Sequence, residues 1–284
     1  MEKSAKKVIM ISGANRGIGR AIAEKLLENG CLLSLGVRDP GQLPQALASA
    51  AETQMLCHSY DARDRESAKS WVDATAEKFG GVDVLVNNAG ILHTIGLEDD
   101  AEDLLDDMWE VNAKAPLRLT RLVFPYLRIS GSGRIIDIIS MSGKRVKGDW
   151  VGYSMSKYAA MAASQTARLK GWDDGIRVTN ICTGFVQSDM TVENAPSFPQ
   201  EKMARPEDVA QIVSTLLLLS NESAIPEVTM NCVFKTLLYS GMELYLFFLD
   251  NHLELYVKGK TDLFKCMIIA CLKLQASFLA VALF

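Results

Sequence analysis

From Lys7 to about Leu219 the chain alternates short apolar runs with longer segments in which apolar residues recur at helical spacing. The short runs, rich in Val, Ile and Leu, predict strands at Val8–Ile11, Leu32–Val37, Gln54–Ser59, Val82–Val86, Arg134–Ile139 and Arg177–Ile181. The longer segments predict helices at Gly17–Asn29, Arg65–Phe79, Asp103–Leu127, Tyr153–Trp172 and Pro206–Leu219. Nearly continuous apolar strands are typical of a parallel sheet covered on both faces. We therefore expect an α/β fold built on a doubly wound parallel sheet.

Residues that favour helix ends agree with these boundaries. Gly30 follows the first predicted helix, where a C-terminal glycine belongs. Asp64 directly precedes the second predicted helix and can cap it through its carboxylate. Pro206 lies in the first turn of the last predicted helix, where its missing N–H group costs nothing.

The pattern changes after about Cys232, and the rest of the chain is apolar and aromatic-rich without clear strand–helix alternation. We expect one domain over residues 1–234, with Val228–Phe234 as its final strand, and an atypical C-terminal extension of unknown role over residues 235–284. Three interpretations of the extension stay open. It is an accessory packing or dimer segment, a non-native or frame-shifted end, or a membrane-associated segment.

The membrane interpretation depends on Cys266–Phe284, a mostly apolar stretch near the length that spans a bilayer. Lys273 and Gln275 fall within it, and a charged group is costly in lipid. An amphipathic or buried helix is therefore favoured over a true span, and membrane contact is not the favoured interpretation.

Composition narrows the classes of function. The chain carries a formal net charge of −4, so it is not suited to hold nucleic acid. Its six cysteines form no CxxC pair and no histidine cluster accompanies them, which argues against a metal site or a disulfide framework and suits a reducing compartment. The N-terminal residues lack the apolar core of a secretory signal. We expect a cytoplasmic protein.

A glycine-rich turn, Ser12-Gly13-Ala14-Asn15-Arg16-Gly17-Ile18-Gly19, lies between the first predicted strand and the first predicted helix. Phosphates bind at such places, because backbone N–H groups and the positive helix end point at them. The glycines allow a tight turn and close approach of a pyrophosphate. A plain structural turn is the alternative, but the strand–turn–helix context indicates a Rossmann-type dinucleotide site. The candidate cofactor-binding residues are Gly13, Asn15, Arg16, Gly17, Ile18 and Gly19.

The end of the second predicted strand indicates which dinucleotide is bound. An acidic residue there binds the ribose 2′-hydroxyl of NAD, whereas an arginine favours the 2′-phosphate of NADP. Arg38 occupies that position, and Arg16 can reach the same phosphate. Asp39, one residue later, is the counter-signal and suits NAD. Two arginines against one displaced aspartate favour NADP(H), with a solvated surface charge as the alternative for Arg38.

Tyr153 and Lys157 lie four residues apart at a predicted helix start, so their side chains share one helical face. A free phenol is a poor base at neutral pH, because its pKa is about 10. A nearby ammonium lowers that pKa, and the pair can then move a proton to or from a carbonyl oxygen. The spacing alone is common, and its alternative is an amphipathic surface helix.

Ser140 strengthens the catalytic interpretation. It ends the strand Ile135–Ile139, and open α/β sheets bind their ligands at the carboxyl ends of strands. A hydroxyl there can hydrogen-bond a substrate oxygen and hold it for hydride transfer. Ser142 is the second choice for this role.

Together these residues resemble the short-chain dehydrogenase/reductase family, classical type, over about Lys6 to Leu219. The resemblance depends on motifs in the family's order and spacing, namely the glycine turn, Asp61, Asn87-Asn88-Ala89-Gly90, Asn112, Ser140 and Tyr153…Lys157. Each motif alone is common, whereas the complete set is specific to the family.

The resemblance implies a role at each position. Tyr153 would be the general acid/base, Lys157 would bind the nicotinamide ribose and lower the pKa of Tyr153, and Ser140 would orient the carbonyl. Asn112, in a long helix, would hold a water that links Lys157 to solvent. The other positions would contact the cofactor: the adenine at Asp61, the cleft at Asn88 and Gly90, and the nicotinamide side at Gly184, Val186 and Ser188. As an alternative, the polar residues among them are turn or helix residues paired with backbone.

We therefore expect an NADP(H)-dependent oxidoreductase that transfers a hydride between nicotinamide and a small carbonyl or secondary alcohol. Two alternatives stay open: a catalytically silent nucleotide-sensing protein, and a membrane-associated reductase of lipid-like substrates. Many family members assemble through a last strand with an Asp-Gly-Gly signature, which is not found after Ser220. A homo-oligomer, dimer or tetramer, is still expected.

Overall fold

The computed structural model describes residues 6–146, 148–232, 243–249 and 252–258. The chain divides into two units, residues 1–233 and residues 234–284, and each is described by itself. The first unit contains the sheet and all the candidate site residues. The predicted division into a domain over residues 1–234 and an extension over residues 235–284 stays a prediction.

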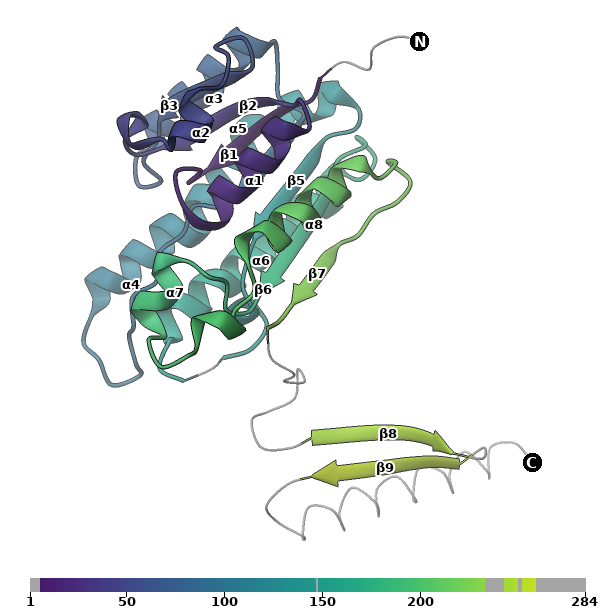
Figure 1. Cartoon of the computed structure of the whole chain (residues 1–284). Helices are drawn as coiled ribbons and strands as arrows, with labels where there is room; N and C mark the ends of the chain where they lie inside the picture. Colours follow the sequence, from purple (N-terminus) through teal and green to yellow (C-terminus); the bar gives the residue numbers. More distant parts are fainter. Residues whose placement is uncertain (1–5, 147, 233–242, 250–251, 259–284) are drawn as a thin grey trace. The chain divides into compact units, whose positions relative to one another are not determined.

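The first unit is built on a seven-stranded parallel sheet in the order β3-β2-β1-β4-β5-β6-β7 (Figure 1). The strands are β1 Val8–Ser12, β2 Leu32–Val37, β3 Met55–Ser59, β4 Val84–Asn87, β5 Arg134–Ile138, β6 Arg177–Thr183 and β7 Glu227–Met230. The chain runs outward from β1 to β3 and then returns to place β4 on the other side of β1. This reversal is the switch point at which sheets of this kind bind ligands. The predicted doubly wound, Rossmann-type fold is confirmed.

Helices cover both faces of this sheet. They are α1 Gly17–Glu28, α2 Gln45–Ala48, α3 Arg65–Phe79, α4 Glu102–Trp109, α5 Ala115–Ser130, α6 Val151–Gly171, α7 Asp189–Asn194 and α8 Pro206–Leu218. Figure 1 shows α1 and α8 side by side on one face, where Ile22 and Val213 join one apolar core. A second core lies on the opposite face, where Trp71 of α3 and Leu119 of α5 pack together.

The predicted helix ends agree with the structure. Gly30 follows α1 with a φ of +80°, a left-handed conformation that glycine adopts without strain. Asp64 caps α3, and its carboxylate accepts a hydrogen bond from Glu66 N at 2.9 Å. Pro206 begins α8. Three short 3₁₀ turns, Pro40–Gln42, Met141–Gly143 and Gln200–Lys202, were not predicted.

The predicted helix Asp103–Leu127 is helical throughout, but it contains a π turn that was not predicted. The stretch consists of α4, a π-helical turn over Glu110–Lys114, and α5, and the residues at both junctions keep α-helical backbone angles. Pro116 lies in the first turn of α5 and has no N–H group to continue the α-helical hydrogen bonds, which favours a change in their pattern at this point. Such π turns are frequent at functional sites, and Asn112 lies within this one.

The last part of the chain differs from the first unit. The expected final strand is β7, which ends at Met230, and residues 233 and 234 of that prediction lie outside the described residues. Two further strands, β8 Glu243–Leu249 and β9 His252–Lys258, pair antiparallel as a hairpin. The predicted apolar segment Cys266–Phe284 also lies outside the described residues. Among the residues described, no helix has the length and apolar character to cross a membrane.

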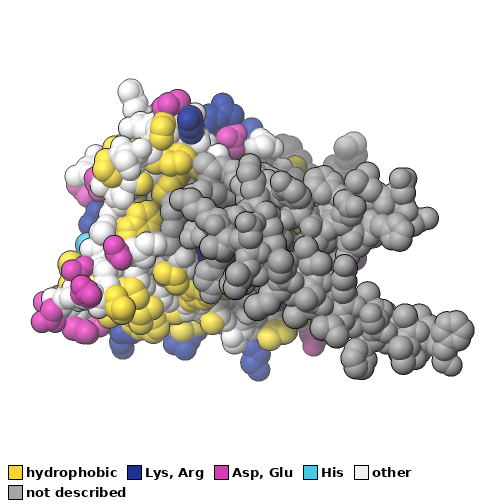
Figure 2. All heavy atoms as spheres, turned by 90° about the horizontal axis from the view of Figure 1, so that it is seen from below, with side chains coloured by type: hydrophobic (Ala, Val, Ile, Leu, Met, Phe, Trp, Pro, Cys, Tyr) yellow, Lys and Arg dark blue, Asp and Glu magenta, His cyan; other side chains and the backbone are white. Residues whose placement is uncertain are grey.

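In the view from below (Figure 2), hydrophobic side chains gather over the middle of the described surface, and the charged side chains lie mostly towards its rim. Large hydrophobic side chains are exposed at scattered positions, which include Leu97, Leu104, Ile129, Leu169 and Leu218. Scattered exposed hydrophobic residues are normal for a folded protein.

A close contact between β2 and α3 gives a stability test. A Cβ atom at Gly36 would lie 2.6 Å from the buried Trp71 ring, whose indole N–H donates to Ser34 Oγ at 2.9 Å. We expect Gly36→Ala to lower the free energy of unfolding by about 1–3 kcal/mol, because the ring must move within a packed core. Denaturant unfolding measures this change.

The matched control is Gly81→Ala. No atom lies within 4 Å of the position its Cβ would take. Its effect should stay within about 0.5 kcal/mol. Equal stabilities for the wild type and Gly36→Ala would contradict the packing described for β2 and α3.

Candidate active site

The candidate site residues gather at the carboxyl ends of β1, β4, β5 and β6. The glycine turn follows β1, Asn88 and Gly90 follow β4, Ser140 follows β5, and Gly184 follows β6. Because all these strands are parallel and adjacent in the order β1-β4-β5-β6, their ends meet at one edge of the sheet. Segments that are far apart in sequence therefore form one site at the switch point.

The glycine turn is held closely against the segment after β4. Asn88 donates from Nδ2 to Ser12 O at 2.9 Å and to Gly13 O at 3.0 Å. A Cβ atom at Gly19 would lie 2.3 Å from Gly13 O, so only glycine fits there. Gly13 and Gly17 have φ values of +68° and +53°, which explains a second requirement for glycine.

The start of α1 suits an anion. Arg16 is the N-cap residue and makes no side-chain cap hydrogen bond, and the first turn, which includes Ile18, contains no acidic residue. The backbone beside Gly17 is open, since the nearest atom to a Cβ there would be Ser188 Cβ at 3.6 Å. Free N–H groups at the positive end of a helix are the donors that a phosphate requires. Residues 13 and 15–19 therefore fit the pyrophosphate of a dinucleotide.

The charged residues expected to choose between NAD and NADP have different surroundings. Arg38 is exposed at the end of β2. The carboxylate of Asp39 accepts from Gly41 N at 2.9 Å and caps the 3₁₀ turn that follows, so it already has a structural role. Arg16 pairs with Asp189 of α7 at 2.8 Å, and more than half of each side chain is exposed (56% and 64%). This partner, distant in sequence, had not been predicted.

Asp61 belongs to a surface network that sequence reasoning missed. It accepts from Arg63 N at 3.0 Å, and its carboxylate lies 3.5 Å from the Arg63 guanidinium. Arg63 binds Asp107 of α4 through two hydrogen bonds, of 2.6 and 2.9 Å, and these bonds hold the pKa of Asp107 below its usual range. Asp107 also lies 3.1 Å from His93 Nε2. Asp107 lies 44 residues from Arg63 and 14 residues from His93 in the sequence, so no local motif indicated the network.

Tyr153 is buried near the start of α6. Its ring packs with Ile95 and Met108, and the Ser140 side chain hydrogen-bonds its hydroxyl. Burial raises the pKa of Tyr153 to about 12, and the Ser140 hydrogen bond acts in the opposite direction. Removal of the phenolate from water is therefore the larger effect on this pKa. The lowering of the Tyr153 pKa by Lys157 stays a prediction.

Ser140 is better placed than Ser142 for the expected contact. Ser140 Oγ accepts from Ser142 N at 3.1 Å, and this bond caps the short turn Met141–Gly143. The same hydroxyl bonds Tyr153. The first choice between the two serines thus lies beside Tyr153, and its role at the substrate oxygen stays a prediction.

Lys157 reaches the site from the next turn of α6. Its Nζ donates to Ile138 O at 3.0 Å and lies 5.8 Å from the centre of the Tyr153 ring. Burial lowers the pKa of Lys157 to about 8, whereas the charge of Asp137 acts to raise it. A Cβ at Gly90 would lie 3.6 Å from the ammonium, so the segment after β4 passes close to it.

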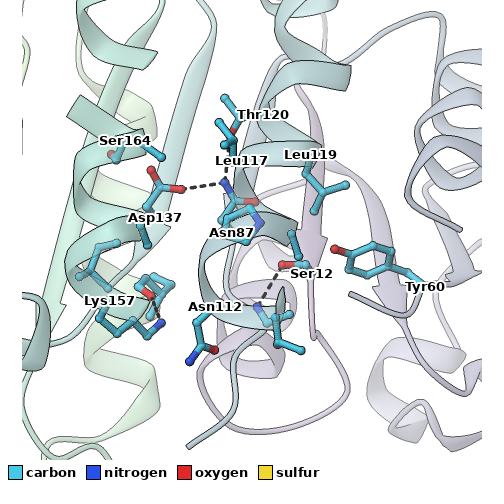
Figure 3. Close-up of a pocket in the computed structure, with 18 residues that line it drawn as sticks. Ser12, Tyr60, Asn87, Asn112, Leu117, Leu119, Thr120, Asp137, Lys157 and Ser164 are labelled. Atoms are coloured by element: carbon cyan, nitrogen blue, oxygen red, sulfur yellow. Dashed lines mark hydrogen bonds between the residues drawn. The ribbon is translucent and has the colours of Figure 1, made fainter. Parts of the chain in front are cut away.

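Asn112 joins the π turn to the same region. Its Oδ1 accepts from Ile91 N at 2.9 Å, and its Nδ2 donates to Ile91 O at 2.8 Å and to Ser156 Oγ at 3.0 Å. These bonds fix the amide next to a small polar cavity that Asn112 and Lys157 line together (Figure 3). The role of Asn112 in holding a water stays a prediction.

The segment after β6 contains the last three candidate cofactor-binding residues. Gly184 N donates to Met230 O at 2.7 Å, and Val186 is buried and bridges to Ala204. Ser188 caps α7 and accepts from Thr191 N at 3.3 Å, so this hydroxyl has a structural partner.

An aromatic group that the sequence had not singled out lies next to two of the candidate site positions in the chain. Trp150, the N-cap residue of α6, contacts the Phe185 ring edge-on with 6.2 Å between ring centres. Phe185 packs against Phe198 at 4.8 Å. The sequence offered one signal for this group: Trp150 lies three residues before Tyr153, and Phe185 directly follows Gly184. In the part of the chain described, no group of three or more side chains could hold a metal ion.

Comparison with known proteins agrees with this geometry. Residues 7–197 match the family model for short chain dehydrogenases. The solved structure of an alcohol dehydrogenase from the archaeon Thermococcus sibiricus, complexed with 5-hydroxy-NADP, has a TM-score of 0.75 and 30% sequence identity to this chain. That match covers 83% of this chain and 100% of the other. The chain belongs to the short-chain dehydrogenase family and has the fold of an oxidoreductase.

Two curated relatives are similar in sequence. The agropine synthesis reductase of Rhizobium rhizogenes is 39% identical over 227 residues, which are 80% of this chain and 52% of that protein. The chain thus spans about half the length of this relative. An uncharacterized oxidoreductase of Staphylococcus saprophyticus is 30% identical over 234 residues, which are 80% of this chain and 97% of that protein.

The buried ammonium gives a pH-dependent stability test. The pKa of Lys157 is about 8 in the folded chain and 10.5 ordinarily, so between these values the unfolded chain binds the extra proton. Lys157 should therefore add to the unfolding free energy as the pH rises from about 8 to 10, by up to about 1.4 kcal/mol per pH unit. The buried Cys182 thiol, whose pKa is raised, acts in the opposite direction at high pH, so the measurement is the difference between the wild type and Lys157→Met in denaturant unfolding at several pH values.

Lys170→Met, at an exposed position of the same helix, is the control and should keep the pH dependence of the wild type. Parallel curves for the wild type and Lys157→Met would show that Lys157 keeps its ordinary titration and would contradict its burial.

Proposed function

We propose that this chain is an NADP(H)-dependent oxidoreductase that interconverts a carbonyl and a secondary alcohol, with Tyr153 as general acid/base. The observation that carries the proposal is the hydrogen bond of the Tyr153 hydroxyl to Ser140, with the buried ammonium of Lys157 on the same helix face. These groups lie at the carboxyl edge of the sheet, where the family fold binds its ligands. A catalytically silent sensor has no need for a buried acid/base of this kind.

Each residue at the site has a separate role in the proposed reaction. Ser140 holds the substrate oxygen next to the Tyr153 hydroxyl, which gives its proton to that oxygen in reduction and takes it back in oxidation. The Lys157 ammonium stabilises the phenolate that forms. The nicotinamide cofactor supplies or accepts the hydride when bound. Trp150, Phe185 and Phe198 offer an apolar wall for the rest of the substrate.

The preference for NADP(H) is supported by the charge at the end of β2. Arg38 is exposed and available to a 2′-phosphate, whereas the Asp39 carboxylate is engaged in a cap. The similar archaeal alcohol dehydrogenase was solved with 5-hydroxy-NADP, which is consistent with this preference. Asp61, Asn88, Gly90, Gly184, Val186 and Ser188 are proposed to line the remaining cofactor contacts. The cytoplasmic location and the homo-oligomer stay predictions.

Tyr153→Phe tests the acid/base role. Removal of the hydroxyl should lower kcat by about 10²–10⁴-fold, the usual contribution of a positioned proton donor. NADPH affinity, measured by fluorescence titration, should change by less than about twofold. Tyr158→Phe, at an exposed position of the same helix, is the matched control. A near-normal rate for Tyr153→Phe against a panel of ketones and aldehydes would exclude the proposed role.

Arg38→Ala tests the choice of cofactor. Loss of a charge-assisted hydrogen bond to the 2′-phosphate should raise the Kd of NADPH by about tenfold or more and leave the Kd of NADH nearly unchanged. Arg121→Ala, an exposed arginine on α5, should alter neither constant. If the wild type binds NADH as tightly as NADPH, the proposed preference is wrong while the oxidoreductase function still stands.

A further inference from the structure

A buried acid that the proposed mechanism does not use lies within β5. Asp137 is 7% exposed, although its neighbours Ile136 and Ile138 are apolar. Side chains alternate along a strand, so Asp137 shares its face with Ile135 and Ile139, the face covered by α5 and α6. A carboxyl in such a place requires partners, because an unpaired buried charge is very costly.

Two neighbouring elements hold the Asp137 carboxyl. Asn87, the residue opposite on β4, donates from Nδ2 to Asp137 Oδ1 at 2.7 Å. Ser164 of α6 hydrogen-bonds the same carboxyl and shares its hydroxyl with Asn180 of β6. These bonds fix the carboxyl but provide no opposite charge.

Lys157 provides that charge from α6. Its ammonium donates to the carbonyl of Ile138, the residue next to Asp137. Both side chains line one polar cavity of about 20 Å³, which has room for about one water (Figure 3). Asn87 also lines it, and Asn87 Oδ1 is buried without a hydrogen-bond partner in the described structure. A water in this cavity would satisfy that oxygen between the two charges.

The groups around the ammonium leave Asp137 as its main opposite charge. The titratable groups that face Lys157 in the described structure are Asp137 from β5, Cys182 from β6 and Tyr153 from its own helix. Burial raises the pKa of the Cys182 thiol to about 11, so this thiol stays neutral at ordinary pH. Tyr60 lines the cavity as well, and burial raises the pKa of its phenol.

We propose that Asp137 is a positioning residue, whose buried carboxylate is the internal counter-charge that keeps Lys157 an ammonium ion beside Tyr153. The attraction acts on both partners: burial raises the pKa of Asp137, and the Lys157 charge opposes that rise. The consequence for catalysis rests on the proposed function, because the ammonium stabilises the Tyr153 phenolate only while it keeps its proton. The pairing itself is measurable without turnover.

The test follows the titration of Lys157 by NMR. Lysine is labelled with ¹³C, the Cε shift of Lys157 is recorded against pH, and its signal is assigned by its loss in Lys157→Met. Asp137→Asn removes the charge and keeps the shape of the side chain. The midpoint should fall by about one pH unit or more, since a close opposite charge shifts a pKa by about 1–3 units. Asp174→Asn, the same change at a surface ion pair with Arg128, should leave the midpoint in place.

A second variant, Asn87→Leu, tests the same pairing if Asp137→Asn does not fold. Asn87→Leu removes the donor that stabilises the carboxylate, and it should lower the midpoint in the same direction by a smaller amount. In an active enzyme, the alkaline limb of the kcat/KM profile for reduction should move to lower pH together with the midpoint. A merely structural role for Asp137 would change stability without moving this limb.

The outcomes separate the two proposals. An unchanged Lys157 midpoint in the folded variants overturns the counter-charge. A lowered midpoint in a protein that turns over no carbonyl substrate supports the counter-charge and counts against the proposed function. A lowered midpoint together with the shifted alkaline limb supports both.

Discussion

The site depends on the burial of one positive charge at the switch point of a parallel sheet. Removal of an ammonium from water is very costly unless other groups compensate for it. Lys157 is 6% exposed, and the Ile138 carbonyl accepts its hydrogen bond while Asp137 supplies an opposite charge. Burial acts on Tyr153 in the opposite sense and makes its phenol a weaker acid. The two groups are therefore tuned by the same apolar surroundings as much as by each other.

Much of the fold followed from the hydrophobic pattern, because strands and helices of this class bury long apolar faces. The π turn at Glu110–Lys114 did not follow, since α4 and α5 continue one helical period and only Pro116 signals the break. Asn112 lies in this turn, and its amide bonds the backbone of Ile91. The hydrophobic pattern alone does not resolve such a local feature of five residues.

The positions of site residues were predictable where motif spacing fixes them. The pKa values and hydrogen-bond partners of these residues were not predictable, because they depend on burial and on residues distant in sequence. The spacing of Tyr153 and Lys157 placed both on one helix face, but their pKa shifts depend on enclosure by other elements. The engagement of Asp39 in a cap and of Arg16 with Asp189 depends on tertiary structure. Asp137 was not singled out, because no motif marks it and its partners Asn87 and Ser164 come from other elements.

The order of the strands has a consequence for the lifetime of the protein. The glycine turn belongs to the half of the sheet with β1, β2 and β3, whereas Ser140 and α6 belong to the half with β4, β5, β6 and β7. A dinucleotide that lies across the switch point contacts both halves and stabilises the folded chain by mass action. Such a cofactor would join the two halves of the sheet, so the concentration of dinucleotide would affect how long the polypeptide resists proteolysis.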